Sequence, residues 1–306
     1  DNVFFCNSGC EANEAAIKLA RLYGHQNGID TPEIIVMEKA FHGRTMATLS
    51  ATGNRKTQAG FEPLVGGFIR VAFDDIEAIQ QIASRKNNVV AILVEPIQGE
   101  GGINIPSNIQ NYLKGLREIC DQHQWLLMLD EVQSGIGRTG KWFAHQHTSI
   151  HPDVMTLAKG LGSGVPIGAC LARGKASQVF TPGKHGSTFG GNPLATAAGY
   201  ATLNIIEEEK LCSHAEKMGA LINEEFTKYL KDCPQVKVIR HLGLMIGIEL
   251  DQPCGDLTKL ALEAGLLINV TAEKVIRLLP PLIINEKEAK ELAERLSQVI
   301  KNFLAK

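Results

Sequence analysis

Long apolar runs, paired cysteines and an excess of charge of either sign are all missing from this sequence of 306 residues. No apolar run reaches the roughly 18 residues that a membrane-spanning helix needs. The seven cysteines are scattered, odd in number and never spaced as Cys-X-X-Cys. That usage favours reduced thiols and a cytoplasmic location over a disulfide framework or a zinc site. The net charge is only −2, so neither nucleic acid nor an acidic membrane is expected as a partner.

The sequence does not begin with methionine, and we expect no signal peptide in it. Its first residues, Asp1-Asn2-Val3-Phe4-Phe5-Cys6, are typical of the middle of a domain, so we expect an upstream segment to be missing. The composition is 44% hydrophobic and 21% charged. These values describe an ordinary globular chain, and its length suffices for two domains with a large core.

The most informative stretch runs from Trp125 to Lys159. One apolar segment, residues 125–129, leads into Asp130-Glu131-Val132-Gln133, and a second, residues 154–158, leads into Lys159. Such short apolar runs are typical of strands buried on both faces of a parallel sheet. Open α/β sheets bind ligands at the carboxyl ends of these strands. Strand alternation would place Asp130 and Val132 on one face, where a single ligand could meet both.

Lys159 is a candidate amine nucleophile, because apolar and glycine neighbours favour the neutral amine. An acid near such a lysine suggests pyridoxal 5′-phosphate (PLP) chemistry. In that chemistry the lysine forms a Schiff base and the acid pairs with the pyridinium nitrogen. Taken alone, Asp130 and Lys159 fit a turn-capping acid and a solvated lysine better, so the rest of the sequence has to decide.

Further motifs follow other predicted strands. A strand over Val3–Cys6, a turn, and a helix from about Glu11 to Tyr23 form the arrangement that holds a phosphate at a helix N-terminus. Phe41-His42-Gly43-Arg44 offers a ring for stacking and a guanidinium for a carboxylate. Each motif has a plainer alternative: a helix cap, a core ring or a surface ion pair. Three histidines, at positions 145, 147 and 151, lack further ligands at a recognised spacing, so no metal site is expected.

The order of elements predicts an α/β fold, with a mostly parallel sheet sandwiched by helices over residues 1–204 and a smaller C-terminal α+β domain over residues 205–306. The boundary is placed within one long helix, expected from about Pro193 to Leu230. In the smaller domain we expect two strands broken near Gly243, a terminal helix capped by Asn285 with Glu288 in a capping box, and further elements at residues 256–264 (helix), 266–270 (strand) and 275–279 (strand).

Together these motifs resemble, over essentially the whole chain and in the same order, those of the class III (fold type I) PLP-dependent aminotransferases, most closely the acetylornithine group. The resemblance implies PLP as the cofactor. It also implies that Asp130 contacts the pyridine nitrogen and that Lys159 is the Schiff-base lysine and general base. The other implied cofactor contacts are Gly9 and Cys10 at the phosphate, Phe41 and Val132 against the ring, Gln133 at the ring hydroxyl and Thr188 at the phosphate. Cys10 stands where the family usually has threonine.

The resemblance also implies how substrates are held. Arg44 would bind a substrate carboxylate, and Arg277 would receive an α-carboxylate and pair with Glu100. Ser187 and Thr188 would come from a neighbouring subunit, which implies a homodimer. The implied reaction, a step of arginine biosynthesis, converts N-acetylornithine and 2-oxoglutarate into N-acetylglutamate semialdehyde and glutamate. Ornithine, succinylornithine and 4-aminobutyrate aminotransferases are alternatives of the same class, and a catalytically silent PLP-binding fragment is an alternative of another.

Overall fold

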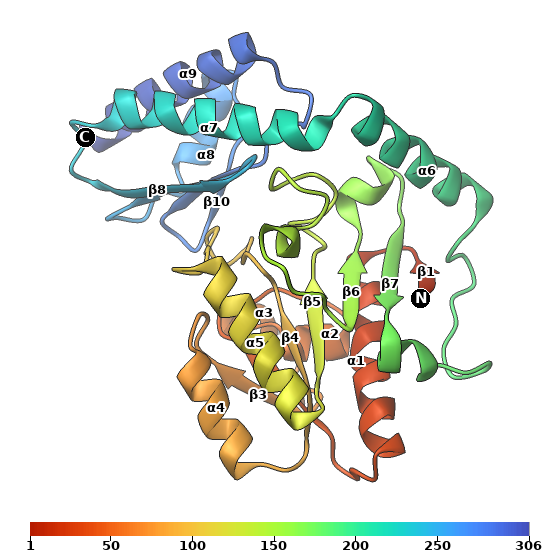
Figure 1. Cartoon of the computed structure of the whole chain (residues 1–306). Helices are drawn as coiled ribbons and strands as arrows, with labels where there is room; N and C mark the ends of the chain where they lie inside the picture. The colour runs from red at the N-terminus through yellow and green to blue at the C-terminus, as the bar shows by residue number, and fades with distance from the viewer. Residues whose placement is uncertain (306) are drawn as a thin grey trace. The chain divides into compact units, whose positions relative to one another are not determined.

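The structure is a computed structural model that describes residues 1–305, and the chain forms two compact units (Figure 1). The first unit contains residues 1–96, 106–136 and 145–204. The second contains residues 97–105, 137–144 and the chain from residue 205 onward. Within the described range no helix is long and apolar enough to cross a membrane, and all seven cysteines are free thiols.

The first unit is built on a mostly parallel sheet of seven strands in the order β1-β7-β6-β5-β4-β2-β3. β7 pairs antiparallel with β1 and with β6, and the other pairings are parallel. Every residue of β4, β5 and β6 is buried, as expected for strands covered on both faces. The predicted α/β fold is therefore confirmed. The strands are β1 (Asn2–Cys6), β2 (Glu33–Met37), β3 (Phe68–Val71), β4 (Val89–Val94), β5 (Leu126–Asp130), β6 (Val154–Leu157) and β7 (Gly168–Ala172).

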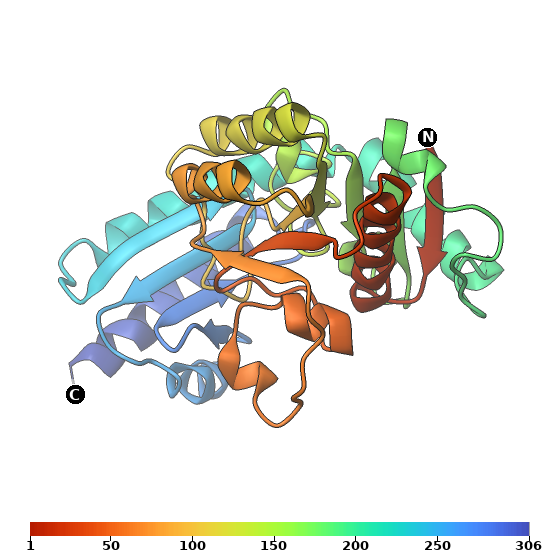
Figure 2. The same cartoon turned by 90° about the horizontal axis from the view of Figure 1, so that it is seen from below.

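Helices cover the two faces of this sheet. α1 (Gly9–Gln26) packs on one face, together with Leu126 and Met128 of β5. α4 (Ile76–Arg85) and α5 (Ile109–His123) pack side by side on the other face, orange and yellow in Figure 2, together with Leu127 and Leu129. Alternate residues of one strand thus serve opposite cores. The shorter helical elements are α2 (Met46–Ala51), α3 (Arg55–Gln58), η1 (Ala144–His147), η2 (Lys159–Gly162) and η3 (Gly174–Gln178).

The second unit is built on an antiparallel sheet in the order β10-β11-β9-β8. Its helices pack on a core in which Phe226, Ile248 and Leu296 are fully buried. The predicted capping box of Asn285 and Glu288 is confirmed at the start of α9. The elements are α7 (Leu211–Leu230), β8 (Val236–Leu242), β9 (Met245–Leu250), α8 (Leu257–Glu263), β10 (Asn269–Thr271), β11 (Val275–Leu278) and α9 (Glu286–Leu304).

Two segments that leave the first unit complete the second one. In residues 97–105, the side chains of Ile97 and Ile103 form a small core with Met245. In residues 137–144, the carbonyl of Arg138 accepts a hydrogen bond of 3.0 Å from the N–H of Leu244. Each segment therefore has its packing or hydrogen-bonding partners in the second unit rather than in the sheet that it leaves.

Some predicted elements were wrong. The single long helix expected over residues 193–230 is two helices, α6 (Pro193–Glu208) and α7, separated at Lys210. Lys210 has a φ of 54°, a left-handed conformation that cannot continue a right-handed helix. The strand expected over residues 266–270 is the shorter β10, which starts three residues later and ends at Thr271. Helices α2, α3 and α4 were not predicted.

Candidate active site

A cavity of about 350 Å³ lies in the first unit, lined by residues that follow β1, β2, β4, β5 and β6. This is the edge of the sheet at which α/β proteins bind ligands. Seven of the eight predicted cofactor residues line the cavity: Gly9, Cys10, Phe41, Asp130, Val132, Gln133 and Lys159. The tertiary structure thus brings together residues that are as many as 150 positions apart in the sequence (Gly9 to Lys159).

The first turn of α1 forms one wall of this cavity. The hydroxyl of Ser8 caps the helix by accepting the N–H of Glu11 at 3.2 Å. The next residues, Gly9 and Cys10, begin the helix, where backbone N–H groups have no intrahelical acceptor and the helix dipole favours an anion. A Cβ atom at Gly9 would lie 2.7 Å from a methyl group of Val132. The close approach of α1 to the turn after β5 therefore requires glycine at position 9.

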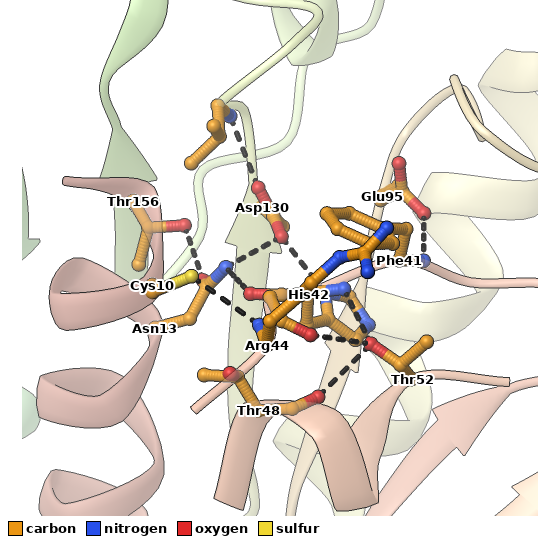
Figure 3. A network of polar contacts seen from close by, with 12 residues as sticks. Cys10, Asn13, Phe41, His42, Arg44, Thr48, Thr52, Glu95, Asp130 and Thr156 are labelled. Atoms are coloured by element: carbon orange, nitrogen blue, oxygen red, sulfur yellow. Dashed lines mark hydrogen bonds and ion pairs between the residues drawn. The ribbon is translucent and has the colours of Figure 1, made fainter. Parts of the chain in front are cut away.

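Asp130, the last residue of β5, is buried and accepts three hydrogen bonds (Figure 3). Its Oδ2 atom accepts from Asn13 Nδ2 at 2.8 Å and lies 2.8 Å from His42 Nδ1, while its Oδ1 atom accepts from the N–H of Val132 at 3.0 Å. A buried carboxylate needs such donors to stay ionised. Because a carboxylate has about four acceptor positions, one further donor can still be bound.

Two of these donors are themselves held in place. The hydroxyl of Thr156 donates to Asn13 Oδ1 at 2.7 Å, and Asn13 Nδ2 also donates to the carbonyl of His42 at 2.8 Å. Thr156 is paired with Asp130 in the register of β5 and β6. Since an ionised Asp130 can only accept, His42 Nδ1 carries the proton in this contact.

Sequence reasoning did not assign a role to Asn13, His42 or Thr156. Two of them lie inside motifs that were identified, Asn13 in the helix after the phosphate turn and His42 between Phe41 and Gly43. Thr156 is a polar residue in an otherwise apolar strand. A buried polar residue in such a position usually has a hydrogen-bond partner, and this was the available signal.

Lys159 lies two positions after the end of β6 and begins η2 with a φ of 44°. β6 is the parallel neighbour of β5, so the amine and the carboxylate of Asp130 enter one cavity from adjacent strand ends. One expectation was wrong: the side chain of Lys159 is exposed in this chain rather than buried among apolar neighbours.

The segment from Phe41 to Arg44 is held by two hydrogen bonds to neighbouring segments and by the tight space around Gly43. The N–H of Phe41 donates to Glu95 Oε1 at 2.9 Å, and the N–H of Arg44 donates to Cys10 Sγ at 3.3 Å (Figure 3). Gly43 has a φ of 142°, and a Cβ atom there would lie 2.7 Å from Cys10 Sγ. Phe41 lines the cavity, whereas Arg44 is exposed and is not among the lining residues.

Ser187 and Thr188 line a different cavity of the first unit, of about 370 Å³, and both are exposed. Ser187 Oγ accepts a hydrogen bond from Asn7 Nδ2 at 3.3 Å. Within one chain these two residues are therefore not brought to the cavity that contains Asp130 and Lys159.

Arg277 and Glu100 pair with each other in the second unit. Arg277 Nη1 lies 2.6 Å from Glu100 Oε1, and Arg277 Nη2 donates to Asn269 Oδ1 at 3.1 Å. The Arg277 side chain is 11% exposed and that of Glu100 39% exposed. Of the two partners, Glu100 thus has more freedom to turn toward solvent.

Glu131, next to Asp130, is fully buried and binds the chain on the far side of the following loop. Its Oε1 atom accepts from the N–H of His145 at 2.9 Å and lies 3.1 Å from His145 Nδ1, while Oε2 accepts from the hydroxyl of Ser134 at 2.7 Å. These contacts fix the turn that carries Val132 and Gln133.

Comparisons with known proteins agree on one family. A family model described as Aminotransferase class-III matches residues 1–300. An acetylornithine aminotransferase of Nitrosomonas europaea is 62% identical over 304 residues, 99% of this chain and 77% of that protein. The crystal structure of the ornithine aminotransferase of Toxoplasma gondii has a TM-score of 0.95 at 36% identity, covering 99% of this chain and 73% of that one. The acetylornithine aminotransferase of Elizabethkingia anophelis has a TM-score of 0.87 at 39% identity, covering 99% and 76%.

Proposed function

The chain belongs to the class-III aminotransferases, and from that premise we propose that it is a PLP-dependent enzyme transferring the amino group of N-acetylornithine to 2-oxoglutarate. The products are N-acetylglutamate semialdehyde and glutamate, in a reaction of arginine biosynthesis. The delivery of Asp130 and Lys159 to one cavity by adjacent parallel strands is the observation that carries the chemistry. The choice of amino donor is supported by the acetylornithine aminotransferase that is 62% identical to this chain.

The residues of the cavity fit PLP. The first turn of α1 offers backbone N–H groups to a phosphate, Phe41 offers an aromatic face, and Asp130 retains an acceptor position beside its three donors. When bound, PLP supplies an aldehyde that accepts the amino group and a ring that delocalises the electron pair left by removal of a proton.

The chain's own residues then have distinct roles. The carboxylate of Asp130 holds the proton of the ring nitrogen, and Asn13 and His42 hold that carboxylate in place. The amine of Lys159 is the covalent anchor and afterwards the general base that removes the proton from the substrate carbon. Gln133 is assigned to the ring hydroxyl, Val132 to the ring face, and Gly9 and Cys10 to the phosphate.

Substrate chemistry explains why the Arg277–Glu100 pair is useful. N-acetylornithine reacts at an amine remote from its carboxylate, whereas glutamate reacts at the carbon that bears its α-carboxylate. We assign Arg277 to the α-carboxylate of glutamate and Arg44 to the other carboxylate. During the acetylornithine half-reaction, Glu100 neutralises Arg277, and the ion pair of 2.6 Å between the two side chains supports this assignment.

A homodimer is part of the proposal. Ser187 and Thr188 line a different cavity from Lys159 within one chain, so a second copy is assigned to supply them. β1 is an edge strand with Val3 and Phe5 exposed by 49% and 36%, and α6 exposes Leu194 and Tyr200 by 74% and 70%. Exposed apolar residues of this kind mark protein–protein interfaces. A charge at position 200, as in Tyr200→Glu, is expected to halve the molar mass measured by light scattering.

Two further assignments complete the proposal. Residues 1–204 are assigned as the PLP-binding domain and residues 205–306 as the small domain, although residues 97–105 and 137–144 belong to the second unit. A cytoplasmic location is supported by the free state of all seven cysteines in the described range, since disulfides are rare in that compartment.

The test is a half-reaction assay of the full-length enzyme with N-acetylornithine, N-succinylornithine, ornithine and 4-aminobutyrate. The absorbance of the bound cofactor is expected to shift fastest with N-acetylornithine, and Lys159→Ala is expected to abolish the shift. Lys175→Ala is the control, since Lys175 lies away from the cavity and donates to the carbonyl of Trp125. Faster reaction with another donor would reassign the substrate. An unshifted band with every donor would indicate a silent PLP-binding protein.

A further inference from the structure

Arg240, on β8, has no role in the proposed chemistry, yet its guanidinium binds the loop that carries Glu100. Arg240 Nε donates to the carbonyls of Gly102 and Ile103 at 3.1 and 2.8 Å, and Nη2 donates to the carbonyl of Gly102 at 2.5 Å. Nη1 binds Glu249 Oε2 at 2.6 Å. We infer that Arg240 is a positioning residue that holds the Glu100 loop, residues 97–105, so that Glu100 remains opposite Arg277.

The Glu100 loop is a tight hairpin. Gln98 and Asn104 exchange two backbone hydrogen bonds of 3.0 Å, and Asn104 Nδ2 donates to Gln98 Oε1 at 2.9 Å and to the carbonyl of Gly101 at 3.0 Å. Glu100 therefore lies at the tip of a closed loop, and movement of its backbone requires the tip to detach from its neighbours.

Two residues of the second unit's sheet hold that tip, one at Glu100 itself and one just after it. The hydroxyl of Thr271 donates to the carbonyl of Glu100 itself. Arg240 binds the carbonyls two and three positions later. With the backbone held at residues 100, 102 and 103, release of Arg277 requires rotation of the Glu100 side chain but no displacement of the loop.

A guanidinium suits this position better than an ammonium does. Its planar fork presents several N–H groups in fixed directions and stays protonated at any pH of interest. Glu249, on the neighbouring strand β9, orients the far side of the fork. A lysine at position 240 could reach one carbonyl at a time without fixing the plane of the loop.

This inference rests on the proposed function, because the two half-reactions are its readout. Loss of the Arg240 contacts lets the tip move and lowers the population of the Glu100–Arg277 pair. The acetylornithine half-reaction, which needs Arg277 neutralised, should then slow, while the glutamate half-reaction, which needs Arg277 released, should not.

The experiment compares Arg240→Gln and Arg240→Lys with Arg295→Gln in the full-length holoenzyme. Arg295 is a matched control in the same unit, since it also binds one glutamate, Glu291, and one backbone carbonyl, that of Ala264, away from the Glu100 loop. In single-turnover assays Arg240→Gln is expected to lower kcat/KM for N-acetylornithine about tenfold and to leave kcat/KM for glutamate within about twofold of the wild type. Arg240→Lys should lower kcat/KM for N-acetylornithine by an intermediate factor. Arg295→Gln should not change the ratio of the two kcat/KM values.

A second measurement does not depend on activity. Hydrogen–deuterium exchange of the amides of residues 99–103 is expected to be faster in Arg240→Gln than in Arg295→Gln or the wild type. The Glu100→Gln variant provides a third check. Adding Arg240→Gln to it should not change further the ratio of kcat/KM for N-acetylornithine to kcat/KM for glutamate, because the acid that Arg240 positions is already gone.

Equal slowing of both half-reactions, or unchanged exchange in the loop, would overturn the inference and leave Arg240 with a purely structural role. Failure of the proposed function looks different. In that case the wild type itself would not react with N-acetylornithine, while faster exchange of residues 99–103 in Arg240→Gln would still support the positioning role.

Discussion

His42 Nδ1 lies 2.8 Å from Asp130 Oδ2, and both side chains are buried. The two residues are 88 positions apart in the sequence. The contact joins the segment that carries Phe41 to the acid at the end of β5 (Figure 3). The orientation of Asp130 thus depends on a residue that is not itself assigned to the cofactor or the substrate.

Replacement of His42 should therefore weaken cofactor binding. His42→Ala removes a hydrogen bond to a buried charge, worth about 1.5–3 kcal/mol, and we expect about a 10- to 100-fold rise in the Kd for PLP. Titration of the apo-protein with PLP, followed by absorbance, measures this change. His25→Ala, at an exposed histidine of α1, is the control. An unchanged Kd in His42→Ala would show that Asn13 and Val132 suffice to hold Asp130.

Gly9 should not tolerate a side chain. In Gly9→Ala the new methyl group would meet Val132 Cγ1 at 2.7 Å, and overpacking of this kind costs about 1–3 kcal/mol. We expect a lower midpoint of thermal unfolding and weaker PLP binding. Gly66→Ala is the matched control, because a Cβ atom there has no neighbour within 4 Å. If the two variants behave alike, the contact between α1 and Val132 is not tight in solution.

Cys10 should limit the affinity for phosphate. Cys10→Thr introduces a hydroxyl donor at the first turn of α1, and a net hydrogen bond contributes about 0.5–1.5 kcal/mol. A decrease of about two- to tenfold in the Kd for PLP is expected, with Cys233→Thr as control. Titration with pyridoxal, which lacks the phosphate, should show no gain. A gain with pyridoxal as well would place the effect away from the phosphate.

Arg277 should matter more for one half-reaction than for the other. In Arg277→Gln the α-carboxylate of glutamate loses a charged hydrogen-bond partner, so we expect kcat/KM for glutamate to fall about 10- to 100-fold. The loss for N-acetylornithine should be smaller. Glu100→Gln should instead lower kcat/KM for N-acetylornithine more than that for glutamate, because no carboxylate then neutralises the charge of Arg277 in either half-reaction. If Arg277→Gln lowers kcat/KM equally in both half-reactions, Arg277 does not have the assigned role of binding the α-carboxylate of glutamate.

His241 should make stability fall at acidic pH. Burial lowers the pKa of His241 below its usual value, although a hydrogen bond with the carbonyl of Gly243 opposes this shift. The unfolded chain therefore binds a proton at higher pH than the folded one, and stability decreases as the pH falls below about 6.5. Denaturant unfolding at pH 7.5 and 5.5 measures the loss, which His241→Gln should reduce and His151→Gln should not.

The sequence by itself determined the elements whose signals are local. The apolar runs at residues 125–129 and 154–158 are typical of buried strands, and β5 and β6 lie there. The capping box of Asn285 and Glu288 involves residues three positions apart, so the start of α9 was predicted correctly. The full set of motifs in their order, rather than those of Asp130 and Lys159 alone, sufficed for the family, because the strand order of an α/β fold brings such strand ends together.

Only the tertiary structure decided the contacts between distant segments. Asn13 and His42 reach Asp130 across 117 and 88 residues, and Arg240 reaches the Glu100 loop across 138, so no local pattern predicts these pairs. The break at Lys210 was also invisible, because its neighbours favour a continuous helix and a single left-handed residue ends it. Sequence periodicity indicates which face of an element is apolar. It does not indicate which residue of a distant element will form a hydrogen bond with a given polar side chain.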